Sequence, residues 1–209
     1  QIAARVGNAP FVTSFEDDHE PLPYNVASVF SQQGERARYR KRKLFGGERN
    51  DHTRGSEAVA TTLGGVTYGL NICFDSCFPS VMRDTALLDG VSVILLPTYD
   101  PIGPYGTIQA FHAAYTPFRA AELGLPIVRA DWTAYSMAVD SRGVIVAEMG
   151  SGTEGVLVAD VTPDRRGTLY RRFGDWFLWA SGLIAIVGLA KGRMARRRPI
   201  PSSLASGQP

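Results

Sequence analysis

The sequence predicts an α/β domain built around a parallel pair of strands, and three neighbouring stretches carry that prediction. Residues 66–72 alternate in the way of a buried strand, and Pro79 then opens a stretch with helical spacing. Residues 91–96 form a continuous apolar run, which is typical of a strand buried on both faces. A helix that crosses between two such strands forms a right-handed βαβ unit, so the two strands are expected to be parallel.

Further strands are expected on both sides of this unit. Alternating or apolar stretches bounded by turn residues precede it at 11–15, 24–30, 36–43 and 57–63. Others follow it at 127–130, 135–139 and 144–149, and residues 156–161 close the domain. A helix is expected over 105–123, with helical spacing at Ile108, Phe111, Tyr115 and Phe118, and Pro117 should bend it.

Composition indicates a globular protein of modest charge. The chain has 209 residues, of which 44% are hydrophobic, enough for one domain with a sizeable core. A net charge of +2 is too small to indicate nucleic acid as the main partner. Two cysteines give no disulfide framework, and no His/Cys cluster has zinc-site spacing, so we expect no metal and no cofactor. The chain begins at Gln1 without an initiator methionine or signal sequence, and we expect it to be a piece of a longer protein.

Cys73 is expected at the point where the strand over 66–72 stops and turns. A strand end would hold the thiol rigidly while the turn exposes it, and backbone N–H groups at a helix start can stabilise developing negative charge. Free cysteine is also among the most buried residue types, so a structural role is the alternative. Cys77 would lie on the opposite side of the turn and is expected to pack.

The basic strand over 36–43 is expected to direct one lysine inward. With a period of two, the four arginines share one face, whereas Tyr39 and Lys41 share the other. A buried, unpaired ammonium is costly, so Lys41 needs a partner or a task. Near a thiol it would lower the cysteine pKa and stabilise an oxyanion. The arginine face is expected to be solvated, or to contact anionic head groups beside a membrane.

Two motifs resemble the nitrilase, or carbon-nitrogen hydrolase, superfamily. They are Tyr39 to Phe45 followed by Gly47-Glu48, and Ile72 to Asp75 followed by Phe78-Pro79. Further segments follow the same family in the same order, at 90–97, 119–122, 126–129 and 136–143. The resemblance covers about residues 24–160. It is greatest to the apolipoprotein N-acyltransferase branch, because a Gly-Asp-Trp and an apolar helix follow the domain.

The resemblance implies a nitrilase-type αββα sandwich, incomplete at its N-terminus and followed by a C-terminal transmembrane helix. The expected parts are a carbon-nitrogen hydrolase domain (1–172), the transmembrane helix (173–192) and a basic, disordered cytoplasmic tail (193–209). Residues 176–190 are uncharged, with tryptophans at one end and basic residues at the other, as at membrane interfaces. At 1.5 Å per residue they span only about 22 Å of a roughly 30 Å hydrocarbon core, so a buried terminal helix is the alternative.

The superfamily works with a Glu-Lys-Cys set, in which glutamate is the general base, lysine steadies the oxyanion and cysteine forms an acyl-thioester. Lys41 and Cys73 match two of these positions. The glutamate has no match and is expected N-terminal to Gln1. Glu48 matches the family's second glutamate near the lysine, the alternative being a surface carboxylate. Asp75 is expected to orient Lys41 or to bond to backbone at the turn.

The helix over 105–123 carries polar residues for which we expect structural roles. Arg119 and Glu122, three residues apart, should form a local ion pair. His112 is expected to pack or to lie at the surface rather than to act in catalysis. A Cys-His hydrolase would need a histidine within reach of Cys73, and none of the three histidines lies in a recognisable motif.

By this resemblance the protein is a membrane-bound acyltransferase. Cys73 would take an acyl group from a phospholipid as a thioester and pass it to the N-terminal amine of an apolipoprotein. The partners would be the phospholipid donor, the lipoprotein acceptor and the plasma (inner) membrane, with the catalytic domain on the extracytoplasmic side. One alternative is an amidase that hydrolyses a small C–N substrate, and another is a catalytically incomplete, membrane-tethered binding domain.

Overall fold

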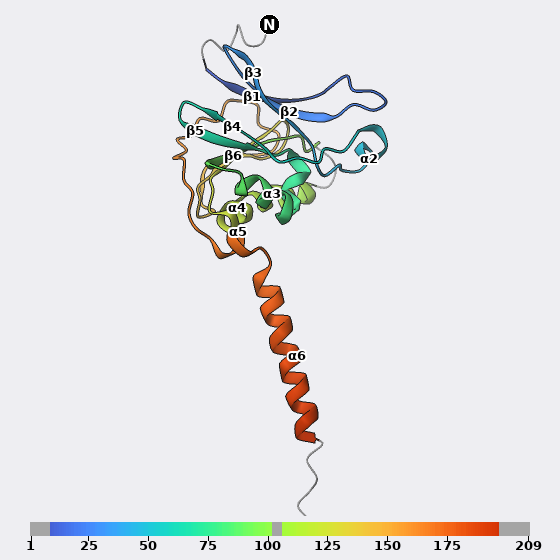
Figure 1. Cartoon of the computed structure of the whole chain (residues 1–209). Coiled ribbons are helices and arrows are strands. Elements are labelled where there is room, and N and C mark those ends of the chain that lie inside the picture. Colours follow the sequence, from blue (N-terminus) through green and yellow to red (C-terminus); the bar gives the residue numbers. More distant parts are fainter. Residues whose placement is uncertain (1–8, 102–105, 197–209) are drawn as a thin grey trace, which may run out of the picture. The chain divides into compact units, whose positions relative to one another are not determined.

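The computed structural model describes residues 9–101 and 106–196, with backbone alone for the last three of them. The chain divides into two compact units, Gln1–Gly174 and Asp175–Pro209. The first unit holds two sheets and most of the helices, and it carries every candidate site residue (Figure 1).

The smaller sheet is an antiparallel meander of three strands. Its order is β1 (Phe11–Glu16), β2 (Asn25–Ser31) and β3 (Gly34–Arg40). Tyr39 is fully buried, and Lys41, one residue beyond the end of β3, is only 3% exposed. The Lys41 N–H donates to the carbonyl oxygen of Asn25 at 2.8 Å, so the strand's alternation continues through Lys41. The predicted inward direction of Tyr39 and Lys41 is therefore confirmed.

The larger sheet has six strands in sequence order, and its centre is parallel. The strands are β4 (Val59–Leu63), β5 (Val66–Leu70), β6 (Val91–Thr98), β7 (Ile127–Asp131), β8 (Ser136–Val139) and β9 (Ile145–Met149). The β5–β6 and β6–β7 pairs are parallel, and the outer pairs are antiparallel. The βαβ unit predicted from the sequence is thus confirmed.

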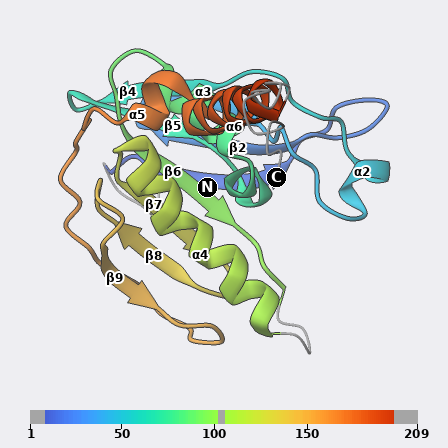
Figure 2. The ribbon, with the colours of Figure 1, turned by 90° about the horizontal axis from the view of Figure 1, so that it is seen from below.

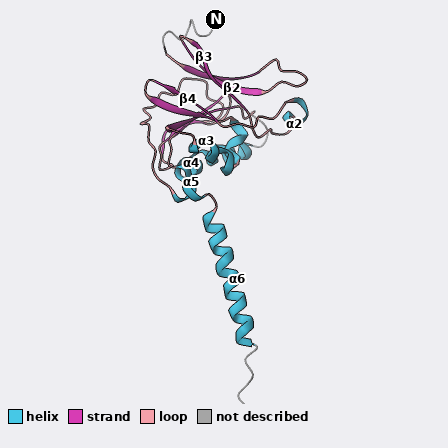
Figure 3. Ribbon diagram, in the orientation of Figure 1, coloured by secondary structure: helices cyan, strands magenta, loops and turns pink. Residues whose placement is uncertain are grey.

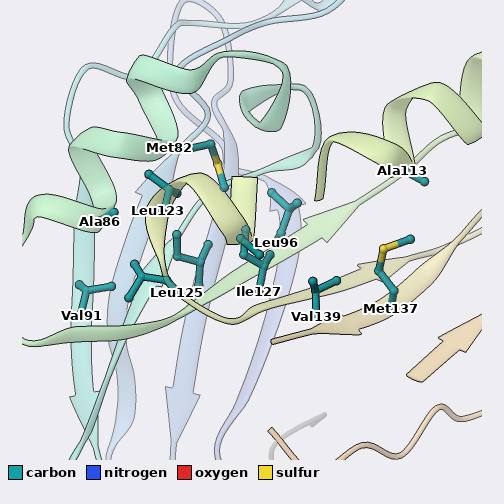
Figure 4. Close-up of a cluster of buried hydrophobic side chains, with 12 residues drawn as sticks. Met82, Ala86, Val91, Leu96, Ala113, Leu123, Leu125, Ile127, Met137 and Val139 are labelled. Atoms are coloured by element: carbon teal, nitrogen blue, oxygen red, sulfur yellow. The ribbon is translucent and has the colours of Figure 1, made fainter. Parts of the chain in front are cut away.

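Helices cover one face of the larger sheet, and the smaller sheet covers the other. Figures 2 and 3 show α3 (Pro79–Leu87) and α4 (Gly106–Leu123) together on one side of the strands. Figure 4 shows the apolar core beneath them, which includes Met82, Leu96 and Ile127. A second buried cluster, which includes Tyr39, Ile72 and Cys73, joins residues of the two sheets. The layers run from the helices through the larger sheet to the smaller sheet, which agrees with the α/β class predicted from the sequence.

The structure adds two short elements and corrects one sequence-based expectation. A 3₁₀ helix, η1 (Cys73–Cys77), forms the turn between β5 and α3, and α3 begins at Pro79 as expected. A short helix, α2 (Glu48–Asp51), lies between β3 and β4. Residues 156–161 close no sheet, since they form no strand.

The apolar stripe of α4 lies on its exposed side. Phe111 is 74% exposed and Phe118 is 65% exposed, although their spacing is that of an apolar helix face. The buried face instead carries polar residues, including His112 and Arg119. This buried face of α4 is polar because it packs on η1 and on buried charged side chains.

The described part of the second unit contains helix α6 (Trp176–Arg196), and the short helix α5 (Leu169–Phe173) precedes it in the first unit. Within 9–101 and 106–196, no helix combines the length and the apolar character required to cross a bilayer. The transmembrane helix expected over 173–192 is therefore not confirmed. The expected disordered tail falls largely on residues 197–209, which lie outside the described part of the chain.

Gly55 offers a test of the packing beside Lys41. A Cβ at Gly55 would lie 2.2 Å from the carbonyl oxygen of Arg40, and the Gly55 N–H donates to the carbonyl oxygen of Lys41 at 2.9 Å. We expect Gly55→Ala to lower the free energy of unfolding of the full-length protein by about 1–3 kcal/mol, because backbone must move to make room. Gly150→Ala is the control, since its Cβ would have no neighbour within 4 Å. Equal urea midpoints for the two variants would contradict the close packing.

Candidate active site

Lys41 is held at the site by a carboxylate. Its Nζ lies 2.8 and 2.7 Å from the two carboxylate oxygens of Glu48, the first residue of α2. Glu48 also accepts from the Asn25 side-chain amide at 2.8 Å and from the Phe45 N–H at 2.7 Å. Burial acts to raise the pKa of Glu48, but the hydrogen bonds from Lys41, Phe45 and Asn25 outweigh it and lower the pKa. The Glu48 carboxylate is therefore ionised at neutral pH, and its two bonds fix the Lys41 side chain in position.

Cys73 begins η1 with an unusual backbone conformation. Its φ is 45°, the only positive φ among the described residues other than glycine. Left-handed backbone is costly for a side chain with a Cβ, and such strain is concentrated at functional sites. The thiol is 9% exposed, and its Sγ lies 3.9 Å from both the carbonyl oxygen of Tyr99 and Oδ1 of Asp100.

The thiol of Cys73 is protonated at neutral pH. Burial raises its pKa to about 11, the charge of Lys41 lowers the pKa, and the charge of Asp100 raises it further. Only the thiolate is nucleophilic, so a reaction at Cys73 needs a base that removes the proton as the bond forms.

Asp75 joins the lysine segment to the cysteine turn. Its carboxylate accepts from the N–H of Lys43 at 2.8 Å, from the N–H of Ile72 at 3.0 Å and from the hydroxyl of Tyr39 at 2.7 Å. The first of these groups lies two residues after Lys41 and the second lies one residue before Cys73. Burial raises the pKa of Asp75, and the three donors oppose that effect. One side chain therefore fixes both backbones.

The structure brings the four predicted site residues together at the ends of β3 and β5. Glu48 is paired with Lys41 rather than with its neighbour Arg49, and Asp75 bonds to backbone at the turn. Cys77 is a half-buried free thiol, and burial raises its pKa to about 11. The ion pair expected between Arg119 and Glu122 is present within α4.

Sequence reasoning missed a buried group of charges beneath the cysteine turn. His112, which was expected to pack or to lie at the surface, is buried, and it is also hydrogen-bonded through both ring nitrogens. Its Nδ1 lies 2.7 Å from Asp100, which in turn accepts from Arg129 at 2.6 Å. Arg129 also donates to Asp131 at 2.8 Å. One signal was present: His112 and Arg119 are seven residues apart and so share a helix face.

Cys73 and two residues near its sulfur could together act as metal ligands. Cys73, Asp100 and His112 each offer one ligand atom, and these atoms lie within 4.8 Å of one another. Thiolate, imidazole and carboxylate form a ligand set that suits zinc. In this structure, however, the carboxylate and both ring nitrogens are already engaged with protein groups.

The family is shown by comparison with known proteins. The carbon-nitrogen hydrolase family matches residues 1–171. This chain belongs to the carbon-nitrogen hydrolase family. Among curated proteins it is similar to the apolipoprotein N-acyltransferase of Geobacter metallireducens, 30% identical over 142 residues, which are 67% of this chain and 27% of that protein. It is also similar to an (R)-stereoselective amidase of a Pseudomonas species, 30% identical over 158 residues, which are 71% of this chain and 56% of that protein.

Solved structures agree with the fold. A variant of the Nesterenkonia AN1 amidase from the nitrilase superfamily aligns with a TM-score of 0.66 and 25% identity, over 81% of this chain and 70% of that one. Another structure of that amidase, with the same TM-score and identity, carries the acetamide moiety of fluoroacetamide on its active-site cysteine. The chain spans about a quarter of the length of the first curated acyltransferases it matches, 27% and 24%.

The raised pKa of Cys73 predicts a steep pH dependence of alkylation. In a Cys77→Ser background, which leaves one thiol, the rate of reaction with iodoacetamide should rise about tenfold per pH unit and level off only near pH 11. Adding Lys41→Met should slow the reaction at every pH below the plateau, because the charge that favours the thiolate is lost. Lys43→Met, at a lysine that lies over the Phe78 ring, is the matched control. A plateau below pH 9 would contradict the thiol's protonation at neutral pH.

The Tyr39 hydroxyl should contribute measurably to stability. Tyr39→Phe removes one donor from the buried carboxylate of Asp75, which should cost about 1–3 kcal/mol of unfolding free energy. Tyr68→Phe is the control, because its hydroxyl has no partner among the described residues. Denaturant unfolding of the full-length variants measures both. A Tyr39→Phe variant as stable as the control would show that the Asp75 bridge does not depend on this bond.

Proposed function

We propose that this chain carries the lysine and cysteine of an apolipoprotein N-acyltransferase, which moves a fatty acyl group from a phospholipid to the N-terminal amine of an apolipoprotein. The observation that carries the proposal is the Asp75 bridge, because it fixes the segment of Lys41 beside the turn of Cys73. The likeness to curated N-acyltransferases supports the choice of reaction.

The first step would form a thioester on Cys73. A base removes the thiol proton while the sulfur attacks the ester carbonyl of the phospholipid, and the ammonium of Lys41 stabilises the tetrahedral oxyanion. Collapse breaks the ester C–O bond, and the base returns its proton to the departing lysophospholipid alkoxide. Glu48 contributes by holding Lys41 in place.

The base is proposed to be the superfamily's glutamate, for which this sequence offers no match. Asp100 lies 3.9 Å from the sulfur but is a poor candidate. Burial acts to raise the pKa of Asp100, but hydrogen bonds and charge from His112 and Arg129 outweigh it and lower the pKa. A carboxylate with a lowered pKa holds a proton weakly, which makes it unsuited to deprotonating a thiol of pKa about 11.

The second step would release the acyl group to the acceptor. The neutral α-amine of the apolipoprotein attacks the thioester carbonyl, and Lys41 again stabilises the oxyanion. Collapse breaks the C–S bond, the sulfur regains a proton from the attacking nitrogen through the base, and an amide is formed. Atoms and charges balance over the two steps, and the cysteine is regenerated.

The membrane part of the proposal is supported by the surface of α6. Its apolar side chains are exposed, among them Trp179 at 76% and Leu189 at 71%. A helix that is apolar on all sides requires an apolar environment, and the proposed donor is a phospholipid while the proposed acceptor is a lipoprotein. We propose that α6 holds the enzyme at the plasma membrane, with the catalytic domain on the extracytoplasmic side.

An amidase of a small substrate is the second candidate. It is favoured by the Pseudomonas relative, of which this chain covers more than it does of the acyltransferases, and by the structural likeness to an amidase. Cys73 would form a thioester with the acyl group of an amide substrate, and an amine would be expelled. Water would then take the place of the lipoprotein amine.

Trapping the thioester tests the proposed function. Full-length protein incubated with acyl-labelled phospholipid should acquire a label that hydroxylamine removes, and Cys73→Ala should abolish it. Cys77→Ala, at the half-buried second thiol, should retain the label and serves as the control. Labelling of Cys73→Ala would end the assignment of the nucleophile. Absence of label in the native enzyme, together with Cys73-dependent hydrolysis of small amides, would favour the amidase.

A further inference from the structure

The imidazole of His112 lies between two groups that can only accept hydrogen bonds. Its Nδ1 is 2.8 and 2.7 Å from the two oxygens of Asp100, and its Nε2 is 3.1 Å from the carbonyl oxygen of Cys73. The pKa of Asp100 is lowered, so the carboxylate is ionised at neutral pH. Neither a carboxylate nor a carbonyl oxygen can donate, so each ring nitrogen needs its own hydrogen.

Ser76 is consistent with the same assignment. Its hydroxyl lies 2.9 Å from the carbonyl oxygen of Cys73 and 3.1 Å from Nε2 of His112. If the hydroxyl donates to the carbonyl and accepts from Nε2–H, every contact in the triangle is attractive. If it donated to a bare Nε2, the lone pairs of that nitrogen and of the Cys73 oxygen would face each other at 3.1 Å. The doubly protonated ring therefore satisfies all the partners.

Charge balance leads to the same conclusion. Asp100, Asp131 and Arg129 form a buried set, and their side chains are 12%, 0% and 0% exposed. Two carboxylates and one guanidinium leave one negative charge uncompensated, and burying such a charge is costly. A positive His112, whose side chain is 10% exposed, makes the set neutral. The nearest other charge on α4, Arg119, is already paired with Glu122.

We propose that His112 is a positioning residue for the nucleophile: an imidazolium, held by Asp100, that donates from Nε2 to the carbonyl of Cys73. This hydrogen bond holds the left-handed backbone at Cys73, whose φ is 45°. The imidazolium also offsets the charge of Asp100, whose Oδ1 lies 3.9 Å from the sulfur and disfavours the thiolate. The inference deepens the proposed function, because it concerns the same cysteine.

The protonated ring also bears on metal binding. An imidazole binds a metal ion through a lone pair, and an imidazolium has none. A metal ion bound by Cys73, Asp100 and His112, whose ligand atoms are close together, would therefore have to displace one of these hydrogens.

The protonation of His112 can be measured directly in the full-length native protein. The chain has three histidines, so ¹⁵N-labelled rings can be assigned by comparison with His112→Gln. At neutral pH, the two ring nitrogens of His112 should both give the signals of N–H groups. A single protonated ring nitrogen would overturn the proposal. This result does not depend on any variant being active.

The consequence for the thiol can be measured without substrate, in a Cys77→Ser background. His112→Gln keeps a donor for the Cys73 carbonyl but removes the positive charge, and we expect alkylation of Cys73 at pH 8 to slow by about tenfold. His52→Gln is the matched control, because His52 also contacts a carboxylate, Glu16, at 3.0 Å, and it should react like the parent. A His112→Gln variant that alkylates as fast as the control would overturn the electrostatic role.

The two proposals fail in distinguishable ways. If phospholipid gives no thioester but both His112 results are as expected, the acyl donor is wrong and the positioning role stands. If His112→Gln does not fold, as judged by circular dichroism, the ring-nitrogen measurement on the native protein decides alone.

Discussion

The carboxylate of Asp75 is the interaction on which the candidate site depends. It accepts from the N–H of Lys43, in the segment of Lys41, and from the N–H of Ile72, at the turn of Cys73, and these two residues are 29 positions apart in the chain. The small sheet delivers the first segment, and the parallel centre of the large sheet delivers the second. Apolar packing between the sheets does not by itself fix the direction of a polar side chain, whereas a shared acceptor fixes both backbones.

Charged side chains near Cys73 shift the pKa of its thiol in opposite directions. Burial raises the pKa of Cys73 and so keeps the thiol protonated, and the positive charge of Lys41 lowers that pKa. On the other side of the turn, the negative charge of Asp100 would work against the thiolate, and His112 and Arg129 are both bound to it. The cysteine is thus influenced by a cation that favours its ionised form and by an anion whose charge His112 and Arg129 offset.

Much of this was predictable from the sequence because strand periodicity is local. A period of two placed Tyr39 and Lys41 on the inner face, and the run of apolar residues at 91–96 identified a central parallel strand. The position of Cys73 at the end of a strand followed in the same way. The family resemblance added Glu48 and Asp75, whose contacts lie in loops and have no periodic signal.

The rest was not predictable because it depends on tertiary partners. In α4 the apolar residues have helical spacing, yet Phe111 and Phe118 are exposed and His112 is buried. That inversion arises because the helix covers charges from Asp100 and Arg129, which come from other elements. The 3₁₀ helix η1 has no marker in residues 73–77, and the left-handed backbone at Cys73 is unexpected for a residue with a side chain.

The central claim is that the Lys41 ammonium stabilises the charge that develops on an acyl group bound to Cys73. A crystal structure of the full-length protein with an acyl group trapped on Cys73 tests it most directly, through the distance between Nζ of Lys41 and the thioester carbonyl oxygen. We expect a hydrogen bond of about 2.7–3.2 Å. A separation beyond about 6 Å, roughly two hydrogen-bond lengths, would contradict the claim.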